Sequence, residues 1–335
     1  MTQARAAMRQ TPGAARSVAL AALTAVLTAV LALSASGLAI GQQQAVGQQP
    51  LTATSPAKAP AAQALPDPRA TLPGTVQFDL HPPGQPDRAY RIQVVEPRGK
   101  PPASGKRPVI YLLDGNAVFG AYYDAVRLQQ DLAGSAIVVA VGYPTDLPFD
   151  FLRRSYDFSP PEPAGKPLPR VNGYPPPLGG EQALLAFLEG TLLPEIARRY
   201  PVDDRRLTLA GHSFGGMYAL NVLYTRPDLF NQIVAISPSL WWQDHYLLDR
   251  ESAFVRQAQA GKADLRRSRL LLMAGGAETA QTVHEARSLA RRLDVALAPQ
   301  GLATVYVELP EETHMSVPVA AATHVLRHVL TARQQ

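Results

Sequence analysis

The chain of 335 residues has no cysteine and only a small surplus of positive charge. Without cysteine it forms neither disulfide bonds nor a lipid-modified N-terminal cysteine, so its folded part must be held by its own hydrophobic core. The formal net charge is +5, and residues 1–40 hold three arginines and no acid, so that +2 remains for the rest. This balance lacks the basic stripe of a nucleic-acid-binding protein, and we expect no nucleic-acid partner.

Residues 1–40 have the pattern of an export signal. The three arginines precede an uncharged apolar run over residues 18–33, and small residues follow it. This predicts a secretory signal cleaved near Ala35 or Ala39 and a periplasmic mature protein. The run is also long enough for an N-terminal membrane anchor, but its alanine, threonine and serine content makes a poor span. We therefore expect no stable membrane insertion after cleavage.

The rest of the chain divides into a linker and one domain. Residues 41–72 are rich in Gln, Ala, Pro and Thr without apolar periodicity, which predicts a disordered linker. Residues 73–335 have the size of one α/β domain and contain eight stretches with strand patterns. The first two alternate between apolar and polar residues, as in an antiparallel edge, and the others are unbroken apolar runs. The predicted strands are 75–80, 88–95, 109–113, 136–141, 207–210, 233–236, 270–273 and 304–309.

Segments of helical length separate the later strands. They are residues 117–131, 180–199, 214–225, 280–297 and 316–331. This alternation predicts a mostly parallel sheet with helices on both faces, and a ligand site at the carboxyl ends of the strands. Residues 144–178 break the rhythm with many prolines and aromatics, and we interpret them as an ordered excursion over the active-site edge.

Residues 207–216 read Leu-Thr-Leu-Ala-Gly-His-Ser-Phe-Gly-Gly. The Gly-x-Ser-x-Gly frame between an apolar run and a helix-like segment predicts a nucleophile elbow that exposes Ser213 above the sheet. Of the seven histidines, only His314 directly follows a strand after Ser213, which makes it the candidate general base. Glu278 follows the preceding strand and is the candidate acid, although a Ser–His pair with weak acid support stays open.

An acyl transfer also needs donors for the developing oxyanion. We expect the backbone N–H of Phe214 and the Asn116 amide, in the loop Asp114-Gly115-Asn116, to supply them, and Asp114 is also suited to cap the helix that follows. His324 and His328 lie four residues apart on a predicted helix, which gives too few ligands for a metal site. We expect neither a metal nor a cofactor.

Five segments resemble the α/β-hydrolase "putative esterase" family, and within it the periplasmic trilactone siderophore esterases that act on enterobactin and salmochelin. The segments are 111–118 (Tyr-Leu-Leu-Asp-Gly-Asn-Ala-Val), 139–150, 156–160, 211–216 and 237–242 (Ser-Pro-Ser-Leu-Trp-Trp). The resemblance implies a cofactor-free serine esterase that opens the lactone ring of a catecholate siderophore, in its ferric or iron-free form. It also implies catalysis by Ser213 and His314, and a basic substrate contact at Arg154 beside Arg153.

Anionic, aromatic catecholates suit guanidinium groups and indole faces, which Arg153, Arg154, Trp241 and Trp242 would supply if they lined one cleft. The alternative is that the tryptophans pack under the excursion and the arginines are solvated. Other functions also stay open: a general carboxylesterase, such as a feruloyl-type or acyl-glycerol esterase, or an acyltransferase with a water-excluding pocket. A siderophore-binding module without chemistry is a further alternative, which the order Ser213, Glu278, His314 argues against.

Overall fold

The structure is a computed structural model that describes residues 71–162 and 176–331. The predicted export signal and nearly all of the predicted linker lie outside the described residues, as does part of the predicted excursion. Among the helices of these two ranges, none is both long and apolar enough to cross a membrane.

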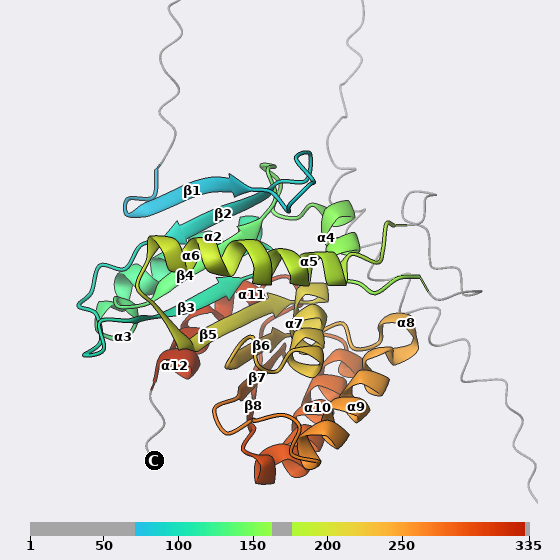
Figure 1. Cartoon of the computed structure of the whole chain (residues 1–335). Coiled ribbons are helices and arrows are strands. Elements are labelled where there is room, and N and C mark those ends of the chain that lie inside the picture. Colours follow the sequence, from blue (N-terminus) through green and yellow to red (C-terminus); the bar gives the residue numbers. More distant parts are fainter. Residues whose placement is uncertain (1–70, 163–175, 332–335) are drawn as a thin grey trace, which may run out of the picture. The chain divides into compact units, whose positions relative to one another are not determined.

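In the part of the chain that the structure describes, eight strands form one sheet in the order β1-β2-β4-β3-β5-β6-β7-β8 (Figure 1). The strands are β1 (Thr75–Leu80), β2 (Tyr90–Val95), β3 (Arg107–Leu112), β4 (Ile137–Gly142), β5 (Val202–His212), β6 (Gln232–Ile236), β7 (Arg269–Gly275) and β8 (Ala303–Leu309). β1 runs antiparallel to β2, and β2 antiparallel to β4, whereas every later pair is parallel. The predicted mostly parallel sheet with an antiparallel N-terminal edge is confirmed.

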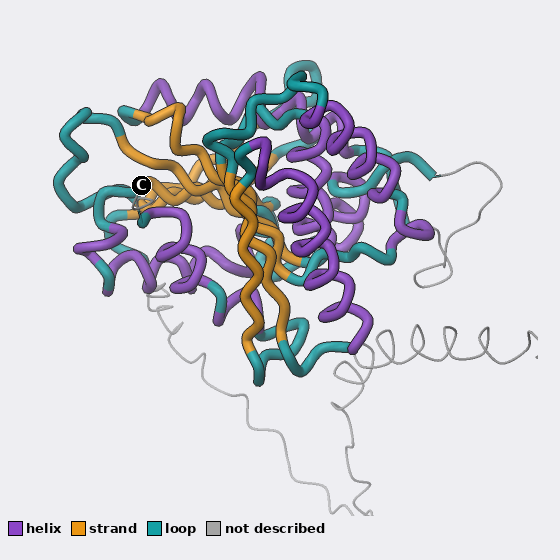
Figure 2. The backbone as a smooth tube through the Cα atoms, turned by 90° about the horizontal axis from the view of Figure 1, so that it is seen from below, coloured by secondary structure: helices purple, strands orange, loops and turns teal. Residues whose placement is uncertain are grey.

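Helices cover both faces of this sheet (Figure 2). Residues along an inner strand alternate between the faces, so Val109 and Tyr111 join one apolar core while Ile110 and Leu112 join the other. One face is covered by α2 (Gly115–Leu128), α3 (Gln130–Ala133), α11 (Val317–Ala320) and α12 (Ala322–Leu330). The other is covered by α5 (Glu181–Phe187), the π-helical η1 (Leu188–Leu192), α6 (Leu193–Arg199), α7 (Phe214–Thr225), α9 (Leu247–Gln259) and α10 (Ala280–Leu297), which the short 3₁₀ turn η2 (Ala298–Gln300) follows.

Within the described residues, three helices were not among the predicted ones: α4 (Phe151–Asp157), α8 (Trp242–His245) and α9. Helix α4 lies inside the proline-rich excursion, where the composition hides it. It begins because the Asp150 side chain caps it, accepting a hydrogen bond from the Arg153 N–H at 3.0 Å. The excursion is therefore partly helical, and α4 brings two arginines toward the carboxyl ends of the strands.

Candidate active site

Ser213 stands between the end of β5 and the start of α7, with φ 57° and ψ −118°. This left-handed backbone, unusual for a residue with a side chain, is held by hydrogen bonds on both sides. The Ser213 N–H donates to the Ile236 carbonyl at 3.0 Å, and its own carbonyl accepts from the N–H of Met217 at 3.0 Å. A Cβ on Gly211 would lie 2.3 Å from the backbone of Gly215, so the turn closes only because Gly211 has no side chain. The elbow geometry follows from this close approach.

The loops after β7 and β8 bring an imidazole and a carboxylate to this serine. His314 Nε2 lies 3.0 Å from Ser213 Oγ, and His314 Nδ1 lies 2.7 Å from Glu278 Oε2. These distances fit a tautomer in which Nδ1–H donates to the carboxylate and Nε2 accepts the serine proton. The Glu278 side chain is 2% exposed and that of His314 is 38% exposed, so solvent reaches the imidazole but not the acid.

Glu278 is held in its ionised form. Burial raises its pKa, but hydrogen bonds from His314, Ser237 and the Gly275 N–H outweigh burial and bring the pKa below its ordinary value. The Gly275 N–H donates to Glu278 Oε1 at 2.8 Å, and the Ser237 hydroxyl donates to the same oxygen. The negative charge of the Glu278 carboxylate therefore lies next to His314 Nδ1, where it would stabilise an imidazolium.

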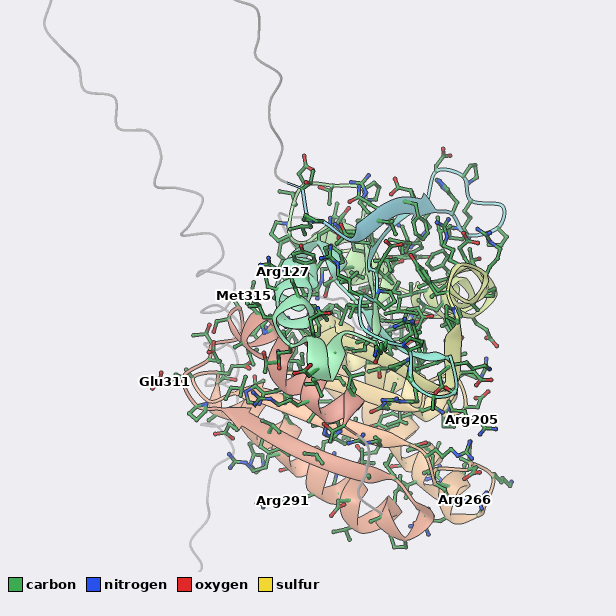
Figure 3. All side chains as sticks on the ribbon, turned by 90° about the vertical axis from the view of Figure 1, so that its left-hand side faces the viewer. Arg127, Arg205, Arg266, Arg291, Glu311 and Met315 are labelled. Carbon is green, nitrogen blue, oxygen red and sulfur yellow. The ribbon has the colours of Figure 1, made fainter. Side chains whose placement is uncertain are left out.

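The loop that carries His314 is tied to the loop after β7. The Ala277 N–H donates to the Glu312 carbonyl at 3.1 Å, and the Gly276 N–H donates to the Leu309 carbonyl at 2.7 Å. Glu311, between these two hydrogen bonds, and Met315, after His314, point outward at the periphery (Figure 3). The loop after β7, which carries Glu278, and the loop after β8, which carries His314, thus support each other. The outer side of the loop after β8 faces solvent.

His212 is a buried neighbour of the base. Its ring centroid lies 4.5 Å from that of His314. Burial, together with the charges of His314 and Arg154, lowers the pKa of His212 well below its ordinary value. A neutral His212 adds no positive charge beside His314, so it does not oppose protonation of the base.

The proposed oxyanion donors are Phe214 and Asn116, each at a helix start, where a backbone N–H has no acceptor within its own helix. The Asn116 side chain is already used: Nδ2 donates to the carbonyls of Tyr143 at 3.0 Å and Thr145 at 2.8 Å, and Oδ1 accepts from the Tyr143 N–H. Only the backbone amide of Asn116 is therefore left for an oxyanion.

Arg154, the first of the two candidate substrate-binding arginines, is held in an ion pair. Arg154 is 7% exposed, and its Nε and Nη2 both donate to the Asp114 carboxylate at 2.9 Å. Asp114 accordingly makes no side-chain cap on α2, and the expected capping role is wrong. The Arg154 guanidinium carbon still lies 5.7 Å from the ring centroid of Phe214, so this ion pair lies beneath the elbow. The pair braces the turn from Asp114 to Asn116, called the oxyanion loop below after the donor expected at Asn116.

Arg153 contacts the neighbouring ends of β2 and β4. Its Nη2 donates to the Ala89 carbonyl at 3.0 Å, and its guanidinium carbon lies 5.1 Å and 4.9 Å from the ring centroids of Tyr90 and Tyr143. Successive helical residues are turned by about 100°, so Arg153 and Arg154 of α4 face different ways. The expectation that both contact the substrate stays a prediction.

The two candidate tryptophans differ in exposure. Trp242 is 8% exposed and packs edge-on against Phe214, with ring centroids 4.6 Å apart. Trp241 is 38% exposed and packs against Trp242. Trp242 is therefore part of the support of the elbow, and Trp241 presents an indole to solvent.

Two further polar groups contact the site and were missed. Ser239 Oγ lies 3.2 Å from Ser213 Oγ, and the Ser237 hydroxyl binds Glu278. Both follow β6, the strand beside β5, so their position at a neighbouring strand end was the available signal.

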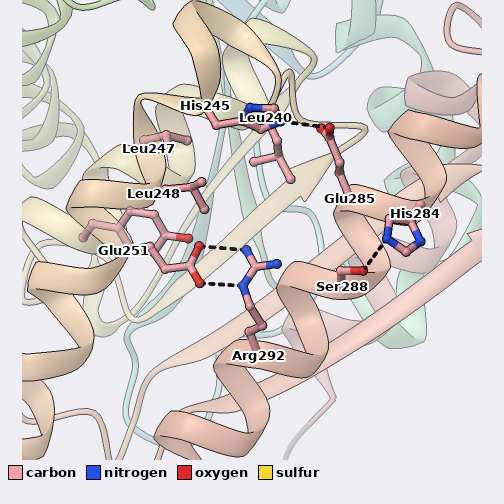
Figure 4. A pocket seen from close by; sticks show the side chains of 10 residues that line it. Leu240, His245, Leu247, Leu248, Glu251, His284, Glu285, Ser288 and Arg292 are labelled. Carbon is pink, nitrogen blue, oxygen red and sulfur yellow. Dashed lines mark hydrogen bonds and ion pairs between the residues drawn. The ribbon is translucent and has the colours of Figure 1, made fainter. Parts of the chain in front are cut away.

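A cavity of about 200 Å³ lies between α9 and α10, and Ser213, Glu278 and His314 are not among the residues that line it (Figure 4). It is lined by Tyr224, Leu240, His245, Leu247, Leu248, Glu251, His284, Glu285, Ser288 and Arg292. Its polar groups pair with one another: His245 with Glu285 at 2.9 Å, and Arg292 with both oxygens of Glu251. Residues 71–162 and 176–331 contain no cluster of three or more His, Asp or Glu that could hold a metal ion.

Comparisons with known proteins give the family. The model of the family described as "Putative esterase" matches residues 84–314. The ferri-bacillibactin esterase BesA of Bacillus subtilis is 36% identical over 269 residues, covering 78% of this chain and 91% of the relative. A siderophore triacetylfusarinine C esterase of Aspergillus fumigatus is 39% identical over 193 residues, covering 55% and 62%. The crystal structure of the BES protein from Bacillus cereus superposes with a TM-score of 0.72 at 30% identity, covering 80% of this chain and 100% of that one.

The fold is therefore that of an α/β-hydrolase, and the protein is a carboxylic ester hydrolase. Since the family model matches more than half of its length, the chain belongs to the esterase family.

Proposed function

We propose that the protein is a serine esterase that hydrolyses ester or lactone bonds of a siderophore, most specifically a catecholate trilactone. The observation that carries the serine mechanism is the unbroken line of contacts from Ser213 Oγ through His314 to the buried Glu278. Two of the relatives are named as a ferri-bacillibactin esterase and a siderophore triacetylfusarinine C esterase, and these names support a siderophore as substrate.

In the proposed reaction, Ser213 Oγ attacks the ester carbonyl carbon while His314 Nε2 takes the hydroxyl proton. Glu278 stabilises the imidazolium, and the backbone N–H groups of Phe214 and Asn116 donate to the oxyanion. His314 then gives its proton to the departing alkoxide, which leaves an acyl-enzyme. Water attacks this ester with His314 as base, and Ser213 is released with its proton restored.

The exposed indole of Trp241 is the aromatic surface we propose for substrate contact. A flat, solvent-facing ring suits the aromatic arms of a catecholate. A direct salt link from Arg154 to an anionic arm would compete with the Asp114 carboxylate, which already takes two of its donors. We therefore assign Arg154 to the support of the oxyanion loop.

The first test is labelling with a fluorophosphonate probe, followed by mass analysis of products from a catecholate trilactone and from aryl esters. We expect the wild type to be labelled and to open the trilactone, and Ser213→Ala to do neither. Hydrolysis of aryl esters alone would indicate a general carboxylesterase. Acyl transfer to an added alcohol would indicate an acyltransferase, and no labelling or turnover would indicate a binding module.

We also propose that the mature protein is exported to the periplasm after removal of the N-terminal signal. The arginines followed by an apolar run and small residues in residues 1–40 support this proposal. Mass determination of the protein from an envelope fraction should give a start near residue 36 or 40. An intact N-terminus in the membrane fraction would instead indicate an anchor.

A further inference from the structure

The turn Ser237-Pro238-Ser239 lies between the elbow and the acid. It follows β6, which pairs with β5 on one side and β7 on the other. The Ser237 N–H donates to the Met273 carbonyl of β7 at 2.8 Å, and the Ser239 N–H donates to the Ser213 carbonyl at 3.2 Å. Both serines are buried, and the two backbone hydrogen bonds fix the turn against the neighbouring strand ends.

We propose that the two hydroxyls of this turn serve the reaction, Ser239 as a hydrogen-bond donor to the nucleophile oxygen and Ser237 as a positioning residue for the acid. The inference rests on the proposed function and adds two residues to it. The turn would thus contact both the nucleophile, through Ser239, and the acid, through Ser237.

The role of Ser239 follows from the number of protons available. Ser213 has one hydroxyl proton, and when this proton is donated to His314 Nε2, the remaining contact at 3.2 Å requires Ser239 to be the donor. As the proton passes to His314, negative charge grows on Ser213 Oγ and the bond from Ser239 strengthens. Ser239 keeps its own proton throughout. The same bond assists when Ser213 Oγ departs during hydrolysis of the acyl-enzyme.

The role of Ser237 follows from how the two carboxylate oxygens are shared. Ser237 and the Gly275 N–H both donate to Glu278 Oε1, which leaves Oε2 to His314. The carboxylate is thus fixed in rotation, and part of its charge is shared with groups other than the base. His314 also faces His212 of β5, and Arg154 of α4 adds its charge there.

The test of Ser239 compares Ser239→Ala with Ser268→Ala. Ser268 is a buried serine at the opposite, amino end of β7 and serves as the matched control. For Ser239→Ala we expect kcat on p-nitrophenyl acetate and the fluorophosphonate labelling rate to fall about 10- to 100-fold, with KM and Tm equal to those of the control. A kcat within twofold of the control, or a loss matched by a fall in Tm, would overturn the role of Ser239.

The test of Ser237 is the pH profile of kcat/KM. In Ser237→Ala the carboxylate no longer shares its charge with a hydroxyl and holds the proton on His314 more tightly. The acid limb should therefore move to higher pH, whereas in Ser239→Ala it should stay in place. If kcat/KM of Ser237→Ala fell by the same factor at every pH, Ser237 would have only a structural role. If the wild type itself neither reacts with the probe nor hydrolyses an ester, the proposed function fails, which is a different result from failure of this inference.

Discussion

The adjacent parallel strands β5 and β6 end in turns that place a serine in opposite ways. Ser213 follows β5 with φ 57° and is half-buried, whereas Ser237 follows β6 with φ 43° and is fully buried. After Ser213 a helix starts at once, which lifts the hydroxyl to the surface. After Ser237 a proline turn comes next, and the hydroxyl stays under the loop of β7. The segment after each serine therefore decides whether its hydroxyl is accessible or buried.

The backbone requirements of the two turns differ as well. The elbow needs glycine, because α7 approaches β5 so closely that a Cβ on Gly211 would overlap the backbone of Gly215. The turn after β6 accommodates Pro238, and a Cβ on Gly216 of α7 would lie 3.3 Å from the Pro238 Cα. A sequence pattern based on glycine spacing identifies the first turn and passes over the second.

The largest expected difference between the two turns is in how far kcat falls when their serines are replaced. Ser213→Ala should lower kcat by about 10⁵-fold or more, since the nucleophile is lost, while Tm stays unchanged. The 10- to 100-fold loss expected for Ser239→Ala is much smaller, because a donor is removed from a nucleophile that is still present. Steady-state kinetics on p-nitrophenyl acetate measures both. Losses of equal size would break the distinction between nucleophile and donor.

The loop after β3 adds a third strand end to the comparison. There the ion pair between Asp114 and Arg154 holds the loop in place. Arg154→Ala leaves the buried Asp114 carboxylate unpaired and should lower the free energy of unfolding by about 3–5 kcal/mol. Activity should fall on the siderophore and on p-nitrophenyl acetate alike, because the oxyanion loop loses its brace.

Urea denaturation and kinetics on both substrates measure these losses. The matched control is Arg198→Ala, whose exposed pair with Glu195 should leave stability unchanged. A loss confined to the siderophore would show instead that Arg154 contacts the substrate.

Substitution at the elbow glycine tests the close approach directly. Gly211→Ala should lower the free energy of unfolding by about 3 kcal/mol, since the added methyl meets backbone atoms that have little freedom to move. Gly120→Ala in α2 is the control, because a Cβ there meets nothing within 4 Å and should stabilise the helix by up to about 1 kcal/mol. Equal effects of the two substitutions in urea denaturation would contradict the elbow geometry.

The smallest expected effect concerns the charge that Ser237 helps to hold. The pKa of Glu278 in the folded state lies below its ordinary value of 4.5, so the ionised group stabilises the fold above that value. This contribution is lost as pH falls through the folded-state pKa. The difference in unfolding free energy between the wild type and Glu278→Gln should therefore be present at pH 7 and shrink below pH 4.5. A difference that stays constant down to pH 3 would contradict it.

Much of the fold could be predicted because buried parallel strands are unbroken apolar runs. All eight strands lie where the sequence indicates, but β5 extends back to Val202, where polar residues replace the apolar pattern. Ser213, Glu278 and His314 could be chosen for a related reason: each follows a strand, and parallel strands bring their carboxyl ends to one edge. The structure indeed places the three within hydrogen-bond distance.

The support of the site could not be predicted in this way. The pair Asp114–Arg154 joins a strand end to a helix that proline-rich composition conceals, and no periodicity links the two positions. Adjacency in the chain also does not make two side chains equivalent. Trp241 and Trp242 are neighbours in the sequence, yet one faces solvent and the other packs under Phe214.

The position of the base in the sheet has a consequence for how the enzyme would lose activity on heating. His314 follows β8, which stands at the end of the strand order and is mostly half-buried, whereas Ser213 and Glu278 follow strands with a neighbour on each side. Edge strands open more readily than inner ones. We expect gentle warming to release the imidazole while the nucleophile remains in its turn, so that inactivation precedes melting of the core, as amide hydrogen exchange along β8 would reveal.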